Sequence, residues 1–103
     1  MKRILLTFAA LTAVTVAAPA LADEAMAKAK GCFACHTVDK KLVGPAYKEV
    51  AKKFAAEKGA ADMLVGKVLN GSSGTWGPVP MPANKTVNEA EAKQLVAWIL
   101  SLK

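Results

Sequence analysis

Two cysteines and one histidine stand close together in the sequence, at Cys32, Cys35 and His36. They form a Cys-x-x-Cys-His pattern, and the chain has no other cysteine or histidine. In this pattern the two thiols can add to the two vinyl groups of one haem, and the histidine that follows can bind the iron. The pattern therefore predicts one covalently attached haem c, with His36 as the only imidazole available to its iron.

Three other roles are open to the same residues. A structural zinc site needs four ligands, and the chain offers no second Cys/His cluster to complete one. A thioredoxin-like redox pair is expected beside a βαβ pattern, which the sequence lacks. A disulfide between Cys32 and Cys35 would close so short a loop that it would stabilise the chain little. Haem attachment is the role that the residues favour.

A methionine is the candidate ligand for the opposite side of the iron, because there is no second histidine. Met26 and Met63 lie on predicted helices, where we expect them to pack against apolar neighbours. Met81 lies in a proline-rich loop, residues 76–82, which can hold a side chain at the iron without a helix. A thioether is a soft, neutral ligand, and His/Met ligation raises the reduction potential. This pair favours reversible electron transfer over catalysis at the iron.

The N-terminal segment has the three parts of a secretory signal peptide. A basic start at Lys2 and Arg3 precedes an Ala-rich apolar stretch, and an A-x-A cleavage sequence occupies residues 20–22. We expect residues 1–22 to be removed, leaving residues 23–103 as one mature domain in the periplasm. Bacteria attach haem c outside the cytoplasmic membrane, so export agrees with the Cys-x-x-Cys-His pattern. No other long apolar run predicts membrane insertion of the mature chain.

Lysines give the mature chain a moderate positive charge. Without Lys2 and Arg3, 12 basic residues face 8 acidic ones, a net charge of +4. The lysines are spread out rather than gathered in a run, which argues against a nucleic-acid-binding tail. A diffuse positive field suits docking to acidic protein surfaces, and it equally suits a merely solvated surface.

Helices are the elements that must position these ligands. Residues 24–31 are rich in good helix formers and would place the Cys-x-x-Cys-His pattern at the C-terminal end of a first helix. Apolar residues at helical spacing predict a second helix over 46–58 and a third over 60–69, the latter ended by Asn70-Gly71. The apolar stripe of the third helix consists of Ala61, Leu64, Val65, Val68 and Leu69.

The C-terminal part of the chain predicts an irregular segment followed by a last helix. The Gly, Ser and Pro content of residues 71–84 rules out an ordinary helix. The last helix should begin near Asn88, which with Glu91 resembles a capping box. Its buried face has i, i+3, i+4, i+7 spacing and consists of Leu95, Trp98, Ile99 and Leu102. No stretch alternates like a strand, so the predicted fold is all-α, with three or four short helices around one haem.

Four stretches of the sequence match one known family. They are Gly-Cys-Phe-Ala-Cys-His at 31–36, Val-Gly-Pro-Ala-Tyr at 43–47, Asn-Gly-Ser-Ser-Gly-Thr-Trp-Gly-Pro-Val-Pro-Met-Pro at 70–82 and Gln-Leu-Val-Ala-Trp-Ile-Leu-Ser at 94–101. With them the chain resembles the small bacterial class I cytochromes c of the c-551/c-552 group, the cytochrome c8 type. The resemblance covers essentially all of residues 23–103 and implies the cytochrome c fold.

The resemblance also implies roles for single residues around the iron. Cys32 and Cys35 would carry the thioether bonds, with His36 as the proximal ligand and Met81 as the distal one. Pro45 resembles the family proline whose carbonyl accepts a hydrogen bond from the histidine ring, which would fix the ring and raise its basicity.

Three further residues match family positions in the haem environment. Trp76 resembles the tryptophan whose indole N–H reaches a haem propionate, and Lys67 stands where relatives place a basic residue near a propionate. Asn84 matches an asparagine near the methionine sulfur.

Together these features predict a monomeric periplasmic electron carrier rather than an enzyme. The family implies cytochrome c oxidase, nitrite reductase or cytochrome c peroxidase as acceptors and a quinol-oxidising complex as donor. The alternative is a haem enzyme or gas-binding protein, which requires that Met81 leave the iron open or dissociate easily. No second histidine or arginine is placed as an acid/base group to support that alternative.

Overall fold

The computed structural model of the chain describes residues 10, 12 and 24–103. Apart from residues 10 and 12, the predicted signal peptide over 1–22 lies outside the described residues, as does Asp23. Among the residues described, no helix is both long and apolar enough to cross a membrane.

Helices are the regular elements of the described chain, as the sequence predicts. They are α1 (Glu24–Ala29), the 3-10 turn η1 (Cys32–Ala34), α2 (Tyr47–Phe54), α3 (Ala60–Asn70) and α4 (Glu89–Ser101). The β pairing recorded within residues 24–103 is one isolated bridge between Ser72 and Met81. The prediction of an all-α fold is therefore confirmed.

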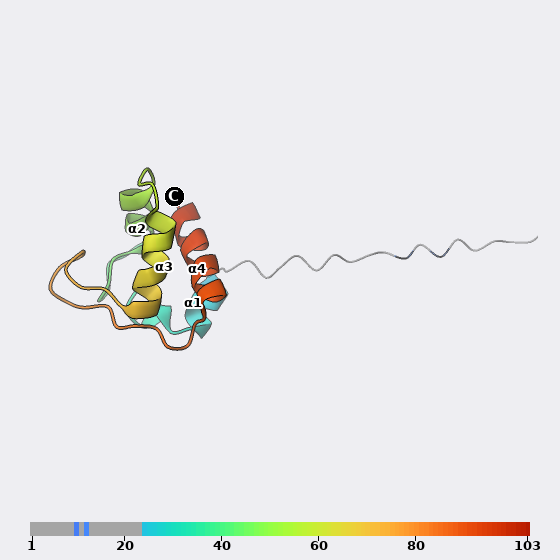
Figure 1. Cartoon of the computed structure of the whole chain (residues 1–103), viewed down its shortest axis with the longest axis horizontal. Coiled ribbons are helices and arrows are strands. Elements are labelled where there is room, and N and C mark those ends of the chain that lie inside the picture. Colours follow the sequence, from blue (N-terminus) through green and yellow to red (C-terminus); the bar gives the residue numbers. More distant parts are fainter. Residues whose placement is uncertain (1–9, 11, 13–23) are drawn as a thin grey trace, which may run out of the picture.

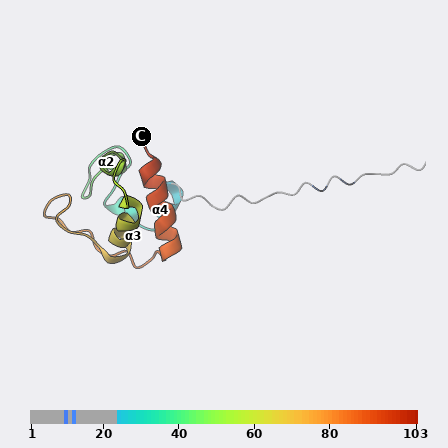
Figure 2. The same ribbon diagram turned by 45° about the horizontal axis from the view of Figure 1, so that its top comes forward.

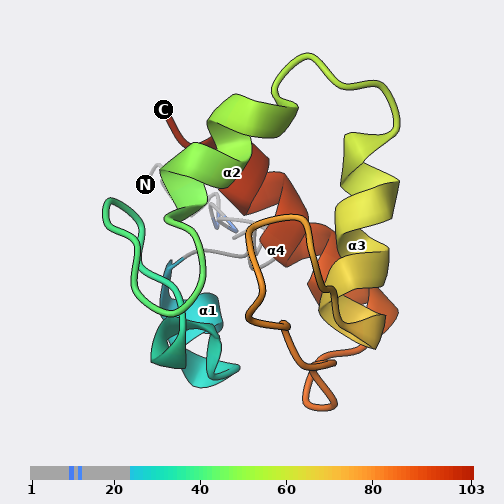
Figure 3. The same ribbon diagram turned by 90° about the vertical axis from the view of Figure 1, so that its left-hand side faces the viewer.

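The C-terminal helix α4 is the central element, because it packs against both α2 and α3 (Figure 1). The long connection between α3 and α4, residues 71–88, projects from the side of α3 that faces away from α4 (Figure 2). Figure 3 looks onto that side and shows the connection in front of the helices. The helices thus pack together through α4, and the connection is an irregular segment on one side of them.

Two apolar clusters join the helices, and α4 contributes to both. One consists of Ala27, Val65, Val87, Ala92, Leu95 and Val96. The other consists of Tyr47, Val50, Phe54, Ala60 and Ile99. On the predicted inner face of α4, Leu95 and Ile99 are buried, whereas Trp98 and Leu102 are half-buried.

The first helix is shorter than predicted. It ends at Ala29, and Gly31 then adopts a left-handed conformation with φ of 80°. A chain that turns left-handed cannot continue an α-helix. The Cys-x-x-Cys-His pattern therefore opens its own 3-10 turn instead of ending α1, which corrects the prediction.

The second helix also ends early, at Phe54 rather than residue 58. Residues 55–58 are all exposed, so a further turn would bury nothing, and turn hydrogen bonds lead from Phe54 through Glu57 to Ala60. The third helix begins at Ala60 as predicted, but Ala60 is buried while Ala61 is exposed. The apolar stripe thus begins one residue earlier than its spacing suggests.

The capping box at the start of α4 is confirmed. The Asn88 side chain accepts a hydrogen bond from the Glu91 backbone N–H at 2.8 Å, and Glu91 Oε1 accepts one from the Asn88 N–H at 3.1 Å. These bonds satisfy two N–H groups that a helix start leaves without partners. They fix where the irregular connection ends and α4 begins.

Candidate functional site

The imidazole of His36 is held in one orientation. His36 is 8% exposed, and its Nδ1 lies 2.8 Å from the carbonyl oxygen of Pro45. A carbonyl can only accept, so Nδ1 carries the hydrogen and Nε2 keeps a free lone pair. This is the tautomer that a neutral imidazole needs to bind a metal ion through Nε2.

Gly44 and Tyr47 both lie close against the same ring. The Tyr47 ring stacks on the imidazole with centroids 4.8 Å apart and planes at 20°. On Gly44, a Cβ atom would lie 2.5 Å from His36 Cε1, which leaves room only for a glycine. We call these two residues the His36 slot. The slot could not be predicted from the sequence, in which Gly44 stands out only as the residue before a proline.

The two thiols lie beside this imidazole. Cys32 and Cys35 are half-buried and unpaired, and the His36 backbone N–H donates to the Cys32 carbonyl at 3.0 Å. Burial raises the pKa of the Cys32 thiol above its ordinary value. A reactive redox pair requires the opposite shift, toward the thiolate, so the site does not favour thioredoxin-like chemistry. Among the described residues, no three His, Cys, Asp or Glu side chains gather as a metal site.

A cavity of about 850 Å³ opens in front of these three residues. All eight residues singled out in the sequence line it, namely Cys32, Cys35, His36, Pro45, Lys67, Trp76, Met81 and Asn84. Apolar side chains from α2, α3 and α4, including Val50, Leu64 and Ile99, complete the wall. The volume lies in the usual range for sites of cofactors and drug-sized ligands, roughly 300–1,000 Å³. Two free thiols, an imidazole with an open Nε2 and a thioether around such a cavity fit a haem.

Met81 is positioned by a paired backbone. Its N–H donates to the Ser72 carbonyl at 2.7 Å, and its carbonyl accepts from the Ser72 N–H at 2.9 Å. Gly71 permits this approach, because it has a φ of 87° and a Cβ there would lie 2.7 Å from the Met81 carbonyl oxygen. The Asn84 N–H donates to the Val68 carbonyl at 2.9 Å. Both ends of the Met81 segment are therefore attached to the end of α3.

The tip of the loop is held against α2 by an aromatic contact. Trp76 is 40% exposed and meets the Phe54 ring edge-on, with centroids 6.4 Å apart. Lys53 Nζ lies 5.4 Å from the Trp76 ring centroid and 5.9 Å from that of Phe54. Lys53 is a contact that the sequence did not reveal, since nothing in the spacing links residues 53 and 76.

The remaining methionines differ in their surroundings. Met26 packs against the first apolar cluster, as predicted. Met63 is 37% exposed at the edge of the cavity, so the expectation that it packs in the core is wrong. Its helix presents Val65 to the core instead, and residue 63 falls on the side that faces the cavity rim.

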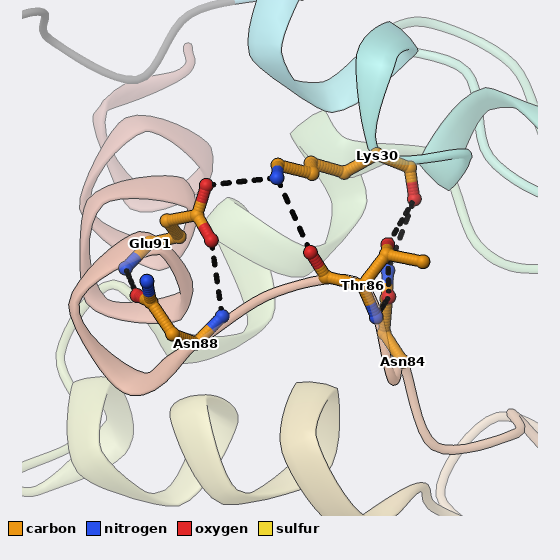
Figure 4. Close-up of polar contacts among 5 residues, drawn as sticks. All are labelled: Lys30, Asn84, Thr86, Asn88 and Glu91. Carbon is orange, nitrogen blue, oxygen red and sulfur yellow. Dashed lines mark hydrogen bonds and ion pairs between the residues drawn. The ribbon is translucent and has the colours of Figure 1, made fainter.

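The side chain of Asn84 is fixed by three hydrogen bonds (Figure 4). Its Nδ2 donates to the Lys30 carbonyl at 3.1 Å, and its Oδ1 accepts from the Thr86 N–H at 2.9 Å and from Thr86 Oγ1 at 2.7 Å. These contacts orient the amide and use one of its two Nδ2 hydrogens.

Comparison with known proteins identifies a family and a fold. The sequence model of the family named Cytochrome c matches residues 22–103. Cytochrome c-551 of Stutzerimonas stutzeri is 55% identical over 105 aligned residues, and cytochrome c-552 of Hydrogenobacter thermophilus is 52% identical over 103, each alignment covering 100% of both chains. The crystal structure of Nitrosomonas europaea cytochrome c552 superposes with a TM-score of 0.76 at 52% identity, covering 79% of this chain and 100% of that one.

Proposed function

The chain belongs to the cytochrome c family, whose members carry electrons on one covalent haem c, and we propose that it is a periplasmic carrier with His36 and Met81 as axial ligands. Cys32, Cys35 and His36 form the attachment motif of that haem. The bound haem supplies an iron that alternates between two oxidation states. The observation that carries the proposal is one cavity lined by an imidazole with a free Nε2 and by the thioether of Met81.

On the proximal side, the chain holds the His36 imidazole in an orientation suited to binding the haem iron. The Pro45 carbonyl accepts the Nδ1 hydrogen, which makes Nε2 the ligating atom and increases its basicity. Gly44 and Tyr47 prevent the ring from turning about its own axis. A ring held in this way need not reorganise when an electron arrives or leaves.

On the distal side, Met81 closes the second axial position. The backbone bridge to Ser72 holds Met81 at the cavity. The soft, neutral sulfur of Met81 favours the reduced iron. With both positions filled there is no site for a substrate or a gas. This supports an electron carrier over the alternative of a haem enzyme or gas-binding protein.

Three cavity residues have proposed roles toward the cofactor. Lys67 is half-buried, and its charge suits a haem propionate. Trp76 would donate its indole N–H to a propionate from the loop tip. Asn84 would use its second Nδ2 hydrogen on the Met81 sulfur, because the first is bound to the Lys30 carbonyl.

The partners we propose are other redox proteins. Three exposed apolar side chains, Val43, Trp76 and Val79, line the same cavity as the lysines Lys41 and Lys85. Such a surface suits brief docking to an acidic protein. Cytochrome c oxidase, nitrite reductase or cytochrome c peroxidase would be acceptors, and a quinol-oxidising complex the donor. The signal-peptide pattern in residues 1–22 supports a periplasmic location.

A spectrum of the haem-loaded protein tests the ligand pair. The oxidised protein should be low-spin, with the weak far-red band of sulfur bound to iron, and Met81→Ala should abolish that band and lower the reduction potential. Met63→Ala is the matched control, because Met63 lines the same cavity and should leave the band intact. A high-spin parent that binds carbon monoxide or peroxide rapidly would overturn the proposal.

A further inference from the structure

Lys30 contacts the segment that follows Met81 from both ends of the residue (Figure 4). Its backbone carbonyl accepts from Asn84 Nδ2 at 3.1 Å. Its ammonium donates to the Thr86 carbonyl at 3.2 Å and pairs with Glu91 Oε2 at 2.9 Å. We call this group of five residues, Lys30, Asn84, Thr86, Asn88 and Glu91, the Lys30 junction.

The junction connects the two ligand-bearing parts of the chain. Lys30 is separated from Cys32 only by Gly31, and Asn84 follows Met81 by three positions. Glu91 extends the contact into α4, since its other oxygen accepts the Asn88 N–H in the capping box. The haem-attachment turn, the Met81 segment and the start of α4 therefore meet at one lysine.

The ion pair within the junction differs from the others in the described chain. The Lys30 and Glu91 side chains are 27% and 24% exposed, whereas those of the other described pairs, Lys28–Glu24, Lys48–Asp39 and Lys93–Glu89, are 43–70% exposed. Exposed pairs of that kind contribute little to stability. A shielded pair that also binds a backbone carbonyl contributes more, because bonds to charged groups are stronger than neutral ones.

We propose that Lys30 is a positioning residue for Met81, which sets how readily the methionine side of the site opens. To move Met81 away from the cavity, the segment over 81–88 must swing, and the junction holds it at Asn84 and Thr86. The same segment is also held at Met81 by the Ser72 bridge and at Asn84 by the bond from its N–H to the Val68 carbonyl. This inference rests on the proposed ligation by Met81.

The test uses the oxidised, haem-loaded protein and free imidazole as a probe that competes with Met81 for the iron. Lys30→Met removes the ammonium and keeps the stem. Lys28→Met is its control, since the Lys28 ammonium pairs with Glu24 on its own helix and lies 5.7 Å from the Phe33 ring centroid, whereas that of Lys30 binds Thr86 and Glu91. Glu91→Gln removes the charge and keeps an acceptor for Asn88, and Glu89→Gln is its control on the same helix.

Loss of the far-red sulfur band reports displacement of Met81. We expect the apparent affinity for imidazole to rise about fivefold to tenfold in Lys30→Met and Glu91→Gln, the size expected for loss of an ordinary hydrogen bond at a partly exposed site. The control variants should stay within about twofold of the parent on the same scale. Amide hydrogen exchange at Met81 and Asn84 should accelerate by a similar factor in the two junction variants. Lys30→Arg should restore most of the parent behaviour.

The variant Leu100→Ala distinguishes a global loss of stability from a local loosening of the Met81 segment. Leu100 is a half-buried core residue that does not line the cavity, so its loss should weaken the fold without favouring imidazole. Equal imidazole affinity in Lys30→Met and Lys28→Met, or an equal rise in Leu100→Ala, overturns the junction proposal while ligation by Met81 stands. A parent without the sulfur band overturns the ligation itself. If Lys30→Met does not take up haem, the imidazole affinity of Glu91→Gln relative to Glu89→Gln tests the junction proposal instead.

Discussion

The His36 side and the Met81 side of the cavity are built in opposite ways. His36 is held by Pro45, Gly44 and Tyr47, all within eleven positions of it in the sequence. The Met81 segment is held by Val68 and by Lys30, and Asn84 and Lys30 are 54 positions apart. One ligand is positioned within a short piece of chain, whereas the other combines the nearby Ser72 bridge with contacts that require Lys30, α3 and α4 to have assembled. We therefore expect the distal side to fail first under mild denaturation.

The largest effect should come from Gly44→Ala, which attacks the proximal side. Its Cβ would lie 2.5 Å from His36 Cε1, and the imidazole is already stacked on the Tyr47 ring and bound to the Pro45 carbonyl, which limits how far it can move. We expect a loss of about 3 kcal/mol in the free energy of unfolding, the upper end for an overpacked site. Urea unfolding of the haem-loaded protein measures it.

Gly66→Ala is the control, because nothing lies within 4 Å of a Cβ at that helical position. It should stabilise the protein by roughly 0.5–1 kcal/mol through helix propensity. If the two alanines had equal effects, the His36 slot would not be a steric constraint.

A smaller effect is expected from Gly71→Ala on the distal side. The substitution forces an alanine to a φ of 87° and brings its Cβ to 2.7 Å from the Met81 carbonyl. We expect about 2 kcal/mol of destabilisation from backbone strain and contact together. The sulfur band should weaken here and persist in Gly44→Ala, which separates the two sides spectroscopically.

Gly74→Ala separates strain from contact at the distal side. Gly74 has a similar φ of 83° but open space around its Cβ position. It should cost stability and leave the sulfur band unchanged. A weakened band in Gly74→Ala would mean that loop strain alone, and not the approach to Met81, controls the ligand.

The contact between Lys53 and Trp76 should contribute about 0.5–1 kcal/mol to the free energy of unfolding, the range for an exposed cation–π pair. Lys53→Met should lower stability by that amount, and Lys52→Met, on the exposed side of the same helix, should not. Trp76 fluorescence in the haem-free chain and urea midpoints of the loaded protein provide the two measurements. Equal urea midpoints for the two variants would mean that the Lys53 contact with Trp76 does not stabilise the loop.

The smallest effect is a dependence on pH that belongs to the distal side alone. A side-chain hydrogen bond with Lys30, together with the Asn88 backbone bond, lowers the pKa of the Glu91 carboxyl. Its contribution is then complete above the unfolded pKa of about 4.3 and is lost as pH falls through the lower folded value. Between pH 6 and pH 3, Glu91→Gln should lose less stability than the parent. Identical acid profiles would contradict the assignment.

Sequence reasoning succeeded where the determining contacts are local. The attachment motif, the irregular 71–84 segment and the capping box at Asn88 depend on neighbours in the chain, and the cytochrome c fold implied by the resemblance is confirmed by the superposition on cytochrome c552. All predicted site residues line one cavity, although their roles toward a haem remain predictions.

Some errors arose from the local backbone, and others arose where distant residues decide. Gly31 ended α1 early, and residues 55–58 found nothing to bury, so helix propensity was overridden at both places. The exposure of Met63 depends on which side of α3 faces the cavity rim. The Lys30 junction could not be predicted, because no periodicity links positions 30 and 86.

The bridge between Ser72 and Met81 has a consequence for how this protein can vary. It closes the loop at its base, so the tip over 74–79 lies beyond the backbone pair that presents the ligand. The tip carries the exposed side chains Trp76 and Val79. Under the proposed ligation by Met81, substitutions at Val79 would change the proposed docking surface without moving the methionine sulfur. Partner choice and redox tuning become separable traits, open to independent selection in evolution or in the laboratory.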